Sequence, residues 1–205
     1  MRILMQPHLW LWWAEIAIDQ ERLAREARAE ALRITPTGDG FGEALIRETR
    51  ASLIAVSASA YALDALYGVM ADIIAPVETG TRWSTLLETF KVAFYVHGRP
   101  GGGGWAGEFE WLFDLRDSAV HHDEENRESV PHLTGTNTSW ANVAYSLESA
   151  ERAVNLMLDV LDTAVLAPRP PVAEWACNHQ HALEALRERR REPPGGDECA
   201  PVVRQ

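Results

Sequence analysis

The chain has little of several residue types on which common function classes depend. Only one of its 19 basic residues is a lysine, Lys91, and 30 acidic residues give a formal net charge of −11. Such a charge repels a phosphate backbone, so any contact with nucleic acid must use a local patch. The two cysteines, Cys177 and Cys199, lack the paired spacing of a zinc knuckle and cannot form a disulfide framework. We therefore expect a reducing, cytoplasmic compartment.

Uninterrupted apolar segments are also missing. The longest apolar run, residues 51–75, contains Asp64 near its middle and Asp72 near its end. Charges at such positions are costly in lipid. At the N-terminus, polar residues and a proline interrupt residues 1–18, and no small-residue cleavage site follows them. The sequence predicts neither a membrane span nor a signal peptide.

Strand-like alternation is absent beyond a few residues, whereas apolar residues recur at helical spacing almost throughout. Glycine and proline separate these segments. The pattern predicts an all-α fold, a bundle of five or six helices that forms a single domain over residues 1–191, followed by a disordered tail over 192–205. The helices are expected over about 8–33, 41–75, 83–96, 105–121, 141–166 and 172–191.

Arg116 is a charged residue on an otherwise apolar face of the fourth predicted helix. Leu112, Phe113 and Val120 lie three or four positions from Arg116 on one apolar helix stripe, and no carboxylate occupies those positions. An unpaired buried guanidinium is very costly. Arg116 must therefore reach solvent, pair with a carboxylate from another helix, or be retained for a ligand.

Two histidines follow Arg116 closely. His121 is separated from it by four residues, and a helix that ends near Val120 would let the imidazole turn back toward the guanidinium. Arg116, the small polar Asp117 and His121 match the signature of the HEPN family. The chain resembles a HEPN-domain protein over about residues 40–167. His122 is an alternative to His121, because motifs with five intervening residues also occur in that family.

The resemblance implies a helical bundle that forms a homodimer, brings two copies of the motif to one cleft, and cleaves RNA without a metal ion or cofactor. The ribose 2′-hydroxyl would be the nucleophile, one histidine the base and a second, protonated histidine the acid. Arg116 would stabilise charge on the phosphoryl oxygens. Asp117 would orient the histidine or cap the cleft, or remain a solvated carboxylate. The products would end in 2′,3′-cyclic phosphate and 5′-hydroxyl.

The resemblance also suggests a toxin or phage-defence effector with an antitoxin or defence-system partner. Members that pair with a minimal nucleotidyltransferase antitoxin often carry a tyrosine two residues after the histidine. Here that position is Asp123, which counts against this form of regulation. The alternative hypothesis is a non-catalytic HEPN-like bundle that binds a nucleotide or a protein, as the acidic charge favours. We expect neither a DNA nor a membrane partner.

Two other groups of residues contain side chains that could bind a metal ion. Residues 121–123 and His132 lack the spacing of helical metal ligands, and no histidine follows an acidic residue by three positions, as a di-iron bundle requires. Cys177, His179 and His181 have the spacing of an opportunistic metal site, or else Cys177 packs in the core and both histidines are solvated. We expect no metal.

The eight tryptophans are expected mainly in the core or in a dimer interface, because aromatic side chains bury a large apolar area. Residues 10–13, at the start of the first helix, either pack on the bundle, exchange into a dimer mate or dock a partner. Trp105, Trp111 and Trp140 flank the motif, and one of them could stack on a base.

Overall fold

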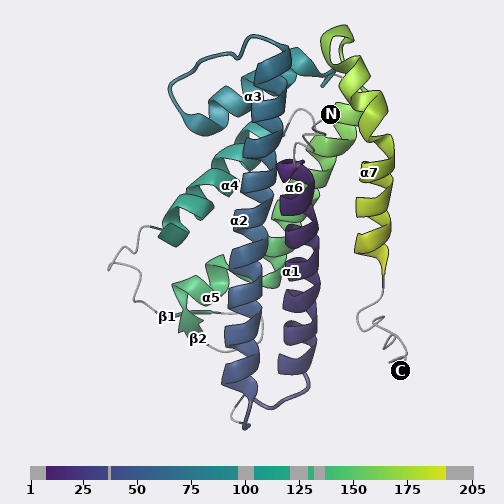
Figure 1. Ribbon diagram of the computed structural model, residues 1–205. Helices are drawn as coiled ribbons and strands as arrows, with labels where there is room; N and C mark the ends of the chain where they lie inside the picture. The colour runs from purple at the N-terminus through teal and green to yellow at the C-terminus, as the bar shows by residue number, and fades with distance from the viewer. Residues whose placement is uncertain (1–7, 37, 97–103, 121–128, 132–136, 193–205) are drawn as a thin grey trace, which may run out of the picture.

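The computed structural model describes residues 8–36, 38–96, 104–120, 129–131 and 137–192. These residues form seven α-helices, one short 3₁₀ helix and a ribbon of two three-residue strands (Figure 1). The all-α bundle is confirmed, with more helices than the five or six predicted. The elements are α1 (Leu9–Ala31), α2 (Phe41–Ile73), α3 (Arg82–Ala93), α4 (Trp105–Val120), β1 (Ser129–Pro131), β2 (Asn137–Ser139), α5 (Trp140–Ala144), α6 (Leu147–Leu166), η1 (Pro170–Val172) and α7 (Ala173–Arg191).

The starts of two helices follow from local chemistry. Helix α2 begins after Gly40, whose φ of 89° lies in the left-handed region that favours glycine. Helix α3 begins after Thr81, whose hydroxyl accepts a hydrogen bond from the backbone N–H of Ser84. Helix α3 ends at Ala93, earlier than predicted, because the backbone N–H of Tyr95 pairs with the end of α6.

The fifth predicted helix is two helices, α5 and α6. The break falls at Tyr145 and Ser146. On one side, the Tyr145 hydroxyl donates a hydrogen bond to the Leu115 carbonyl of α4 at 2.9 Å. On the other, the Leu147 N–H donates to the carboxylate of Glu48 in α2 at 3.0 Å. Both contacts join residues that are distant in sequence, so a local apolar period cannot reveal the break.

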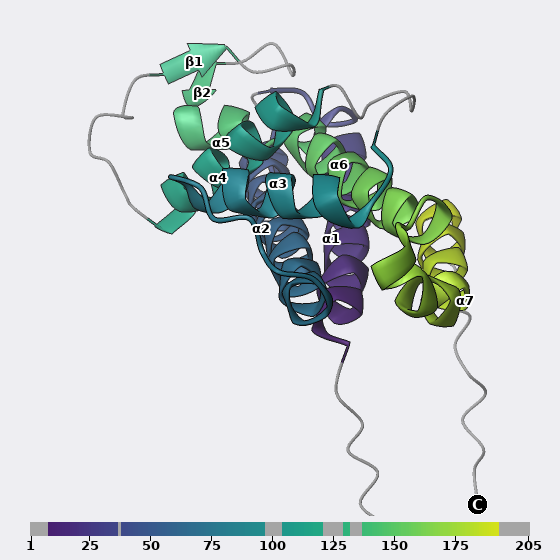
Figure 2. The same cartoon turned by 90° about the horizontal axis from the view of Figure 1, so that it is seen from above.

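The helices pack in two layers. Helices α1 and α2 lie side by side and antiparallel in one layer, with α4 and α6 behind them and α7 at the edge (Figures 1 and 2). Helix α2 packs against α1, α3, α4, α5 and α6, which makes it the central helix of the bundle.

Within the described chain, α2 is the one helix whose length and apolar composition would allow it to cross a membrane. Half of its most apolar window is buried inside the bundle. The central helix of a bundle shares this composition, because it is covered on several sides.

Aromatic rings connect the core to the stripe of α4. The ring centroids of Phe90 and Phe109 are 6.1 Å apart, and those of Phe109 and Phe113 are 6.3 Å apart. Leu112 and Phe113 are buried, as the stripe predicted, and so is Phe109, which lies three and four positions before them on the same face. This packing fixes the face of α4 on which Arg116 lies.

Candidate functional site

Arg116 lies four residues before the last residue of α4, Val120, and its side chain is 17% exposed. The guanidinium carbon lies 4.6 Å from the centroid of the Phe113 ring. This distance is typical of a cation–π contact. The apolar stripe therefore does carry an inward-facing arginine, and its charge needs a partner.

The partner on the inner side is Asp64 of α2. Nη1 of Arg116 donates to Oδ2 of Asp64 at 3.0 Å, and the Asp64 side chain is 21% exposed. The other oxygen, Oδ1, accepts a hydrogen bond from Nε of Arg82 at 2.9 Å. One carboxylate thus holds two guanidinium groups, one from the start of α3 and one from the end of α4.

Sequence reasoning used Asp64 only as an argument against a membrane span. Its role as the partner of Arg116 was missed, and so was the part played by Arg82. The available signal was a lone carboxylate in the middle of an apolar helix, which needs a cation from another element.

The partner on the outer side is Asp117, the next residue along α4. Its Oδ1 accepts hydrogen bonds from Nε and Nη2 of Arg116 at 2.9 and 2.7 Å. The Asp117 side chain is 59% exposed, so this pair is worth at most about 1 kcal/mol. The prediction that no neighbour on the helix pairs with Arg116 was incomplete, because it considered only positions three and four residues away.

Tyr145 forms a hydrogen bond with the backbone of α4 next to Arg116. Its hydroxyl donates to the carbonyl of Leu115, the residue before Arg116. Burial raises the pKa of Tyr145 to about 12, so the hydroxyl keeps its proton and remains a donor at neutral pH. The backbone beside Arg116 is therefore fixed by a tertiary hydrogen bond.

Both candidate histidines, His121 and His122, lie outside the described residues, as do Asp123 and His132. Helix α4 is described as far as Val120, the last described residue before these histidines, so the expected helix end there also stays a prediction. The approach of an imidazole to Arg116 stays a prediction.

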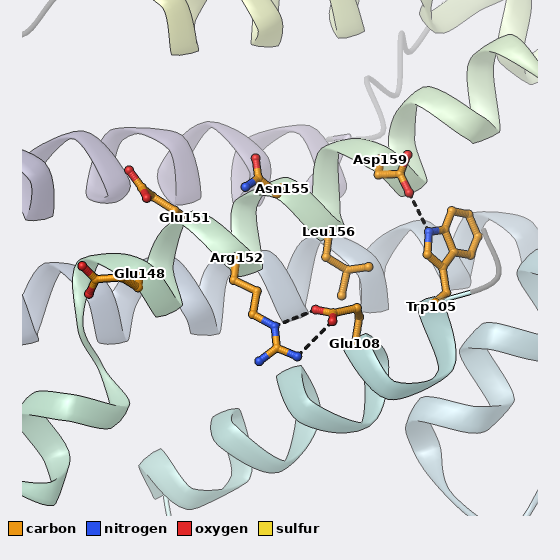
Figure 3. A pocket seen from close by; sticks show the side chains of 9 residues that line it. Trp105, Glu108, Glu148, Glu151, Arg152, Asn155, Leu156 and Asp159 are labelled. Carbon is orange, nitrogen blue, oxygen red and sulfur yellow. Dashed lines mark hydrogen bonds and ion pairs between the residues drawn. The ribbon is translucent and has the colours of Figure 1, made fainter. Parts of the chain in front are cut away.

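A pocket of about 570 Å³ lies between α4 and α6 (Figure 3). Arg152 and Glu108 form a two-point ion pair across it, with distances of 2.7 and 2.9 Å. At the other end, Nε1 of Trp105 donates to Asp159 at 2.6 Å. Glu148 and Glu151 add to its acidic lining. Four carboxylates around one paired arginine disfavour a phosphate ligand, and Arg116 is not part of this lining.

The tryptophans near the motif differ in their accessibility. Trp105 is 2% exposed and packs in the core, so it offers no face to a base. Trp111 is half-buried, and the guanidinium of Arg152 lies 3.9 Å from its ring centroid. Trp140 is half-buried beside Tyr145. Trp105 is therefore unsuited to stacking on a base and a ring face of Trp111 is covered by Arg152, whereas stacking on Trp140 stays a prediction.

Within the described residues, no group of three or more histidine, cysteine, aspartate or glutamate side chains could hold a metal ion. Cys177 is exposed, which contradicts its expected place in the core: the buried residues of α7 are Ala176, Leu183 and Leu186. His181 is fully exposed, as expected. His179 instead stacks on Trp175 at 4.6 Å.

Burial lowers the pKa of His179. Its Nδ1 lies 2.6 Å from the backbone carbonyl of Trp175. This histidine therefore packs as a neutral ring in the contact between α7 and α1.

A helical bundle does not by itself specify a function. Among the described residues, Arg116 is the side chain best placed to bind an anion. Asp64 holds it on its inner side, and the exposed Asp117 holds it on its outer side. Comparisons of the chain with protein-family models, with curated proteins and with solved structures give no match.

Proposed function

We propose that the chain is a metal-independent endoribonuclease of the HEPN type that acts as a homodimer, with Arg116 and His121 as its catalytic pair. The supporting observation is the orientation of the guanidinium. Asp64 holds Nη1, whereas the Nε–Nη2 edge meets the exposed Asp117. That edge matches two non-bridging oxygens of a phosphodiester. A substrate phosphate would replace the carboxylate of Asp117, exchanging one anion for another.

The proposed reaction is an in-line transesterification. The bond between the 2′-oxygen and phosphorus forms while the bond from phosphorus to the 5′-oxygen breaks. One His121 accepts the proton of the 2′-hydroxyl, and the partner's His121 donates a proton to the leaving 5′-oxygen. Arg116 stabilises the negative charge that develops on the non-bridging oxygens. The products are a 2′,3′-cyclic phosphate and a 5′-hydroxyl, and water is not consumed.

The test is to incubate the purified protein with total RNA in EDTA, beside Arg116→Ala and His121→Ala variants. We expect cleavage by the wild type and a loss of at least about a hundredfold in each variant, as for removal of a charge-stabilising group or of an acid–base group. A His122→Ala variant tests the alternative base.

Arg152→Ala is the matched control, because Arg152 is also ion-paired and also lies over an aromatic ring, but on α6. Its activity should stay near that of the wild type. Equal activity in wild type and Arg116→Ala would remove Arg116 from the chemistry. RNA that stays equally intact with the wild type and with every variant would contradict the proposed ribonuclease activity.

The toxin or defence role is a further part of the proposal. Induction of the wild-type chain in a bacterial host should arrest growth, and Arg116→Ala should not. Co-expression with the product of the neighbouring gene should relieve the arrest if that product is the antitoxin.

A second candidate is a non-catalytic bundle that binds a nucleotide or a protein. The observation that favours it is that two carboxylates already pair with Arg116, on a chain of net charge −11. Calorimetric titration with ATP and with GMP would test the nucleotide form. Binding that is lost in Arg116→Ala, together with intact RNA in every sample, would favour this candidate over the ribonuclease.

A further inference from the structure

Arg82, the first residue of α3, lies against the side of α2 whose Asp64 also holds Arg116. Its Nε donates to Oδ1 of Asp64 at 2.9 Å, and its guanidinium carbon lies 4.3 Å from the centroid of the Tyr67 ring. Asp64 and Tyr67 are three residues apart on α2, so they share one face of that helix. These two contacts fix the plane and the direction of the Arg82 guanidinium.

One edge of this guanidinium is still available to a ligand. Within the described part of the chain, Asp64 is the one acceptor for Arg82, and it meets Nε. Nη1 and Nη2 form the other edge, on a side chain that is 48% exposed. Arg28 shows that this edge can hold an anion, because its Nη1 and Nη2 donate to the two carboxylate oxygens of Glu148 at 2.8 and 3.0 Å. Arg82 can therefore bind an anion without releasing Asp64.

Arg82 also changes the charge balance around Arg116. If Asp64 faced Arg116 alone, the two charges would cancel and leave little attraction for a phosphate. With Arg82 on its other oxygen, Asp64 faces two guanidinium groups, which keep their charge at any physiological pH. The second negative charge comes from the exposed Asp117, the group that a substrate phosphate would replace. The inner three side chains thus keep a positive charge in a chain of net charge −11.

The spacing of the two arginines suits consecutive phosphates of one strand. Nε of Arg82 and Nη1 of Arg116 each lie one hydrogen bond from the same carboxylate, so these nitrogens are at most about 8 Å apart. Successive phosphates of a single strand are separated by one sugar, which is a comparable distance. Proteins bind single strands through such a series of charged contacts to the backbone.

We propose that Arg82 binds the phosphate next to the scissile one through its Nη1–Nη2 edge, while Arg116 binds the scissile phosphate. The ligand is a ribonucleotide strand with at least two consecutive phosphates, so a dinucleotide with a single phosphate is a poor substrate. Arg82 is a binding residue in this scheme and takes no part in making or breaking bonds. The inference deepens the proposed function and rests on it for the identity of the ligand.

The experiment removes one phosphate charge at a time from the substrate. The strand is deoxyribose with a single ribose, and an uncharged methylphosphonate replaces the phosphate on the 5′ or on the 3′ side of the scissile one. For the wild type, we expect the methylphosphonate on one of these sides to raise KM about fivefold, as for loss of a partly exposed ion pair. The change in kcat should be smaller, because the scissile phosphate is untouched.

Arg82→Gln tests whether Arg82 is the residue that contacts the neighbouring phosphate. The variant loses the charge, so KM for the unmodified strand should rise about fivefold, and the methylphosphonate should then have no further effect. If Arg82 acted only on the structure of α3, the variant would still respond to the methylphosphonate as the wild type does. Arg82→Lys keeps the charge and should recover part of the response.

Arg152→Gln is the matched control. Arg152 is 46% exposed, is also paired with a carboxylate and also lies over an aromatic ring, but on α6. This variant should respond to the methylphosphonate as the wild type does. Circular dichroism of all variants checks that the helices are intact.

Binding is measured apart from cleavage, with a 2′-O-methyl ribonucleotide strand, which has no free 2′-hydroxyl to attack phosphorus. Fluorescence anisotropy should give a Kd about fivefold higher for Arg82→Gln than for the wild type. Placing the methylphosphonate beside the phosphate on Arg116 should remove that difference, because the wild type then loses the same contact.

Two results would overturn the inference. One is a wild type that tolerates the methylphosphonate on both sides, and the other is an Arg82→Gln variant that still responds to it fully. The two proposals fail separately. Binding that depends on Arg82 without any cleavage counts against the ribonuclease only, whereas cleavage that is insensitive to both neighbouring phosphates counts against the Arg82 site only.

Discussion

Two arginines of this bundle, Arg28 and Arg116, each hold two carboxylates, yet they differ in which edge of the guanidinium the buried carboxylate occupies. Arg28 donates from Nε and Nη2 to Glu48 at 2.7 and 2.6 Å. Glu48 is 1% exposed and Arg28 is 7% exposed. The second carboxylate, Glu148, is 46% exposed and meets Nη1 and Nη2.

The arrangement at Arg116 is the reverse. The partly buried Asp64 meets only Nη1, and the Nε–Nη2 edge is left to the exposed Asp117. Arg28 therefore stabilises the packing of α1 against α2 and α6. At Arg116, by contrast, the Nε–Nη2 edge pairs only with an exposed carboxylate, which a ligand could replace. Position on the guanidinium, rather than the number of partners, separates the two roles.

Arg28 is held in its charged form by its two carboxylates. Burial alone would lower the pKa of Arg28, but the hydrogen bonds that it donates to Glu48 and Glu148 outweigh burial, and its pKa is raised. Arg28 therefore keeps its charge. Removing the arginine would leave the buried carboxylate of Glu48 without compensation.

The largest expected effect comes from Arg28→Met. This change keeps the side-chain length but strands a buried charge, and loss of one partner of a buried pair costs about 3–5 kcal/mol of unfolding free energy. Urea unfolding followed by circular dichroism measures it. Arg116→Met is the matched variant and should cost about 1 kcal/mol, because its outer pair is exposed. Equal losses of unfolding free energy in the two variants would show that Arg28 and Arg116 do not differ in structural role.

A smaller effect is expected for Asp64→Asn. The amide keeps the shape of the side chain but removes the charge that orients Arg116 and Arg82, so unfolding free energy should fall by about 1 kcal/mol. In the ribonuclease assay, kcat should fall more than KM rises, since the edge of Arg116 that is proposed to bind the phosphate loses its orientation. Asp114→Asn, at an exposed position of α4, is the control. An unchanged kcat in Asp64→Asn would show that this carboxylate does not position Arg116.

The smallest effect on stability is expected for Asp117→Asn, within about 0.5 kcal/mol of the wild type. Its effect on RNA should have the opposite sign to that of Arg116→Ala. Removing the competing anion should raise kcat/KM, by about threefold if the exposed pair is worth the usual 0.2–1 kcal/mol. A loss as large as that of Arg116→Ala would instead mean that Asp117 orients the histidine.

Local periodicity predicted what depends on one helix at a time. The stripe of α4 placed Phe109, Leu112 and Phe113 in the core and Arg116 among them, as the structure has them. The starts of α2 after Gly40 and of α3 after Thr81 likewise depend on single residues. These features are set by neighbours within one turn.

Contacts between distant residues were beyond this reasoning. Nothing near Asp64 in the sequence points to Arg116, 52 residues away. The break between α5 and α6 depends on Leu115 and Glu48, which accept hydrogen bonds from Tyr145 and Leu147. The face of α7 that is buried was also misjudged, because polar residues surround its few core positions, and Cys177 proved to be exposed.

The most direct test of the central claim uses an oligonucleotide of deoxyribose with one ribose, incubated with the wild-type chain in EDTA. If Arg116 and His121 drive attack by the 2′-hydroxyl, mass spectrometry should find one cut, directly 3′ of the ribose, with 2′,3′-cyclic phosphate and 5′-hydroxyl ends. Cleavage of the fully deoxyribose strand, or products ending in 5′-phosphate, would contradict the account.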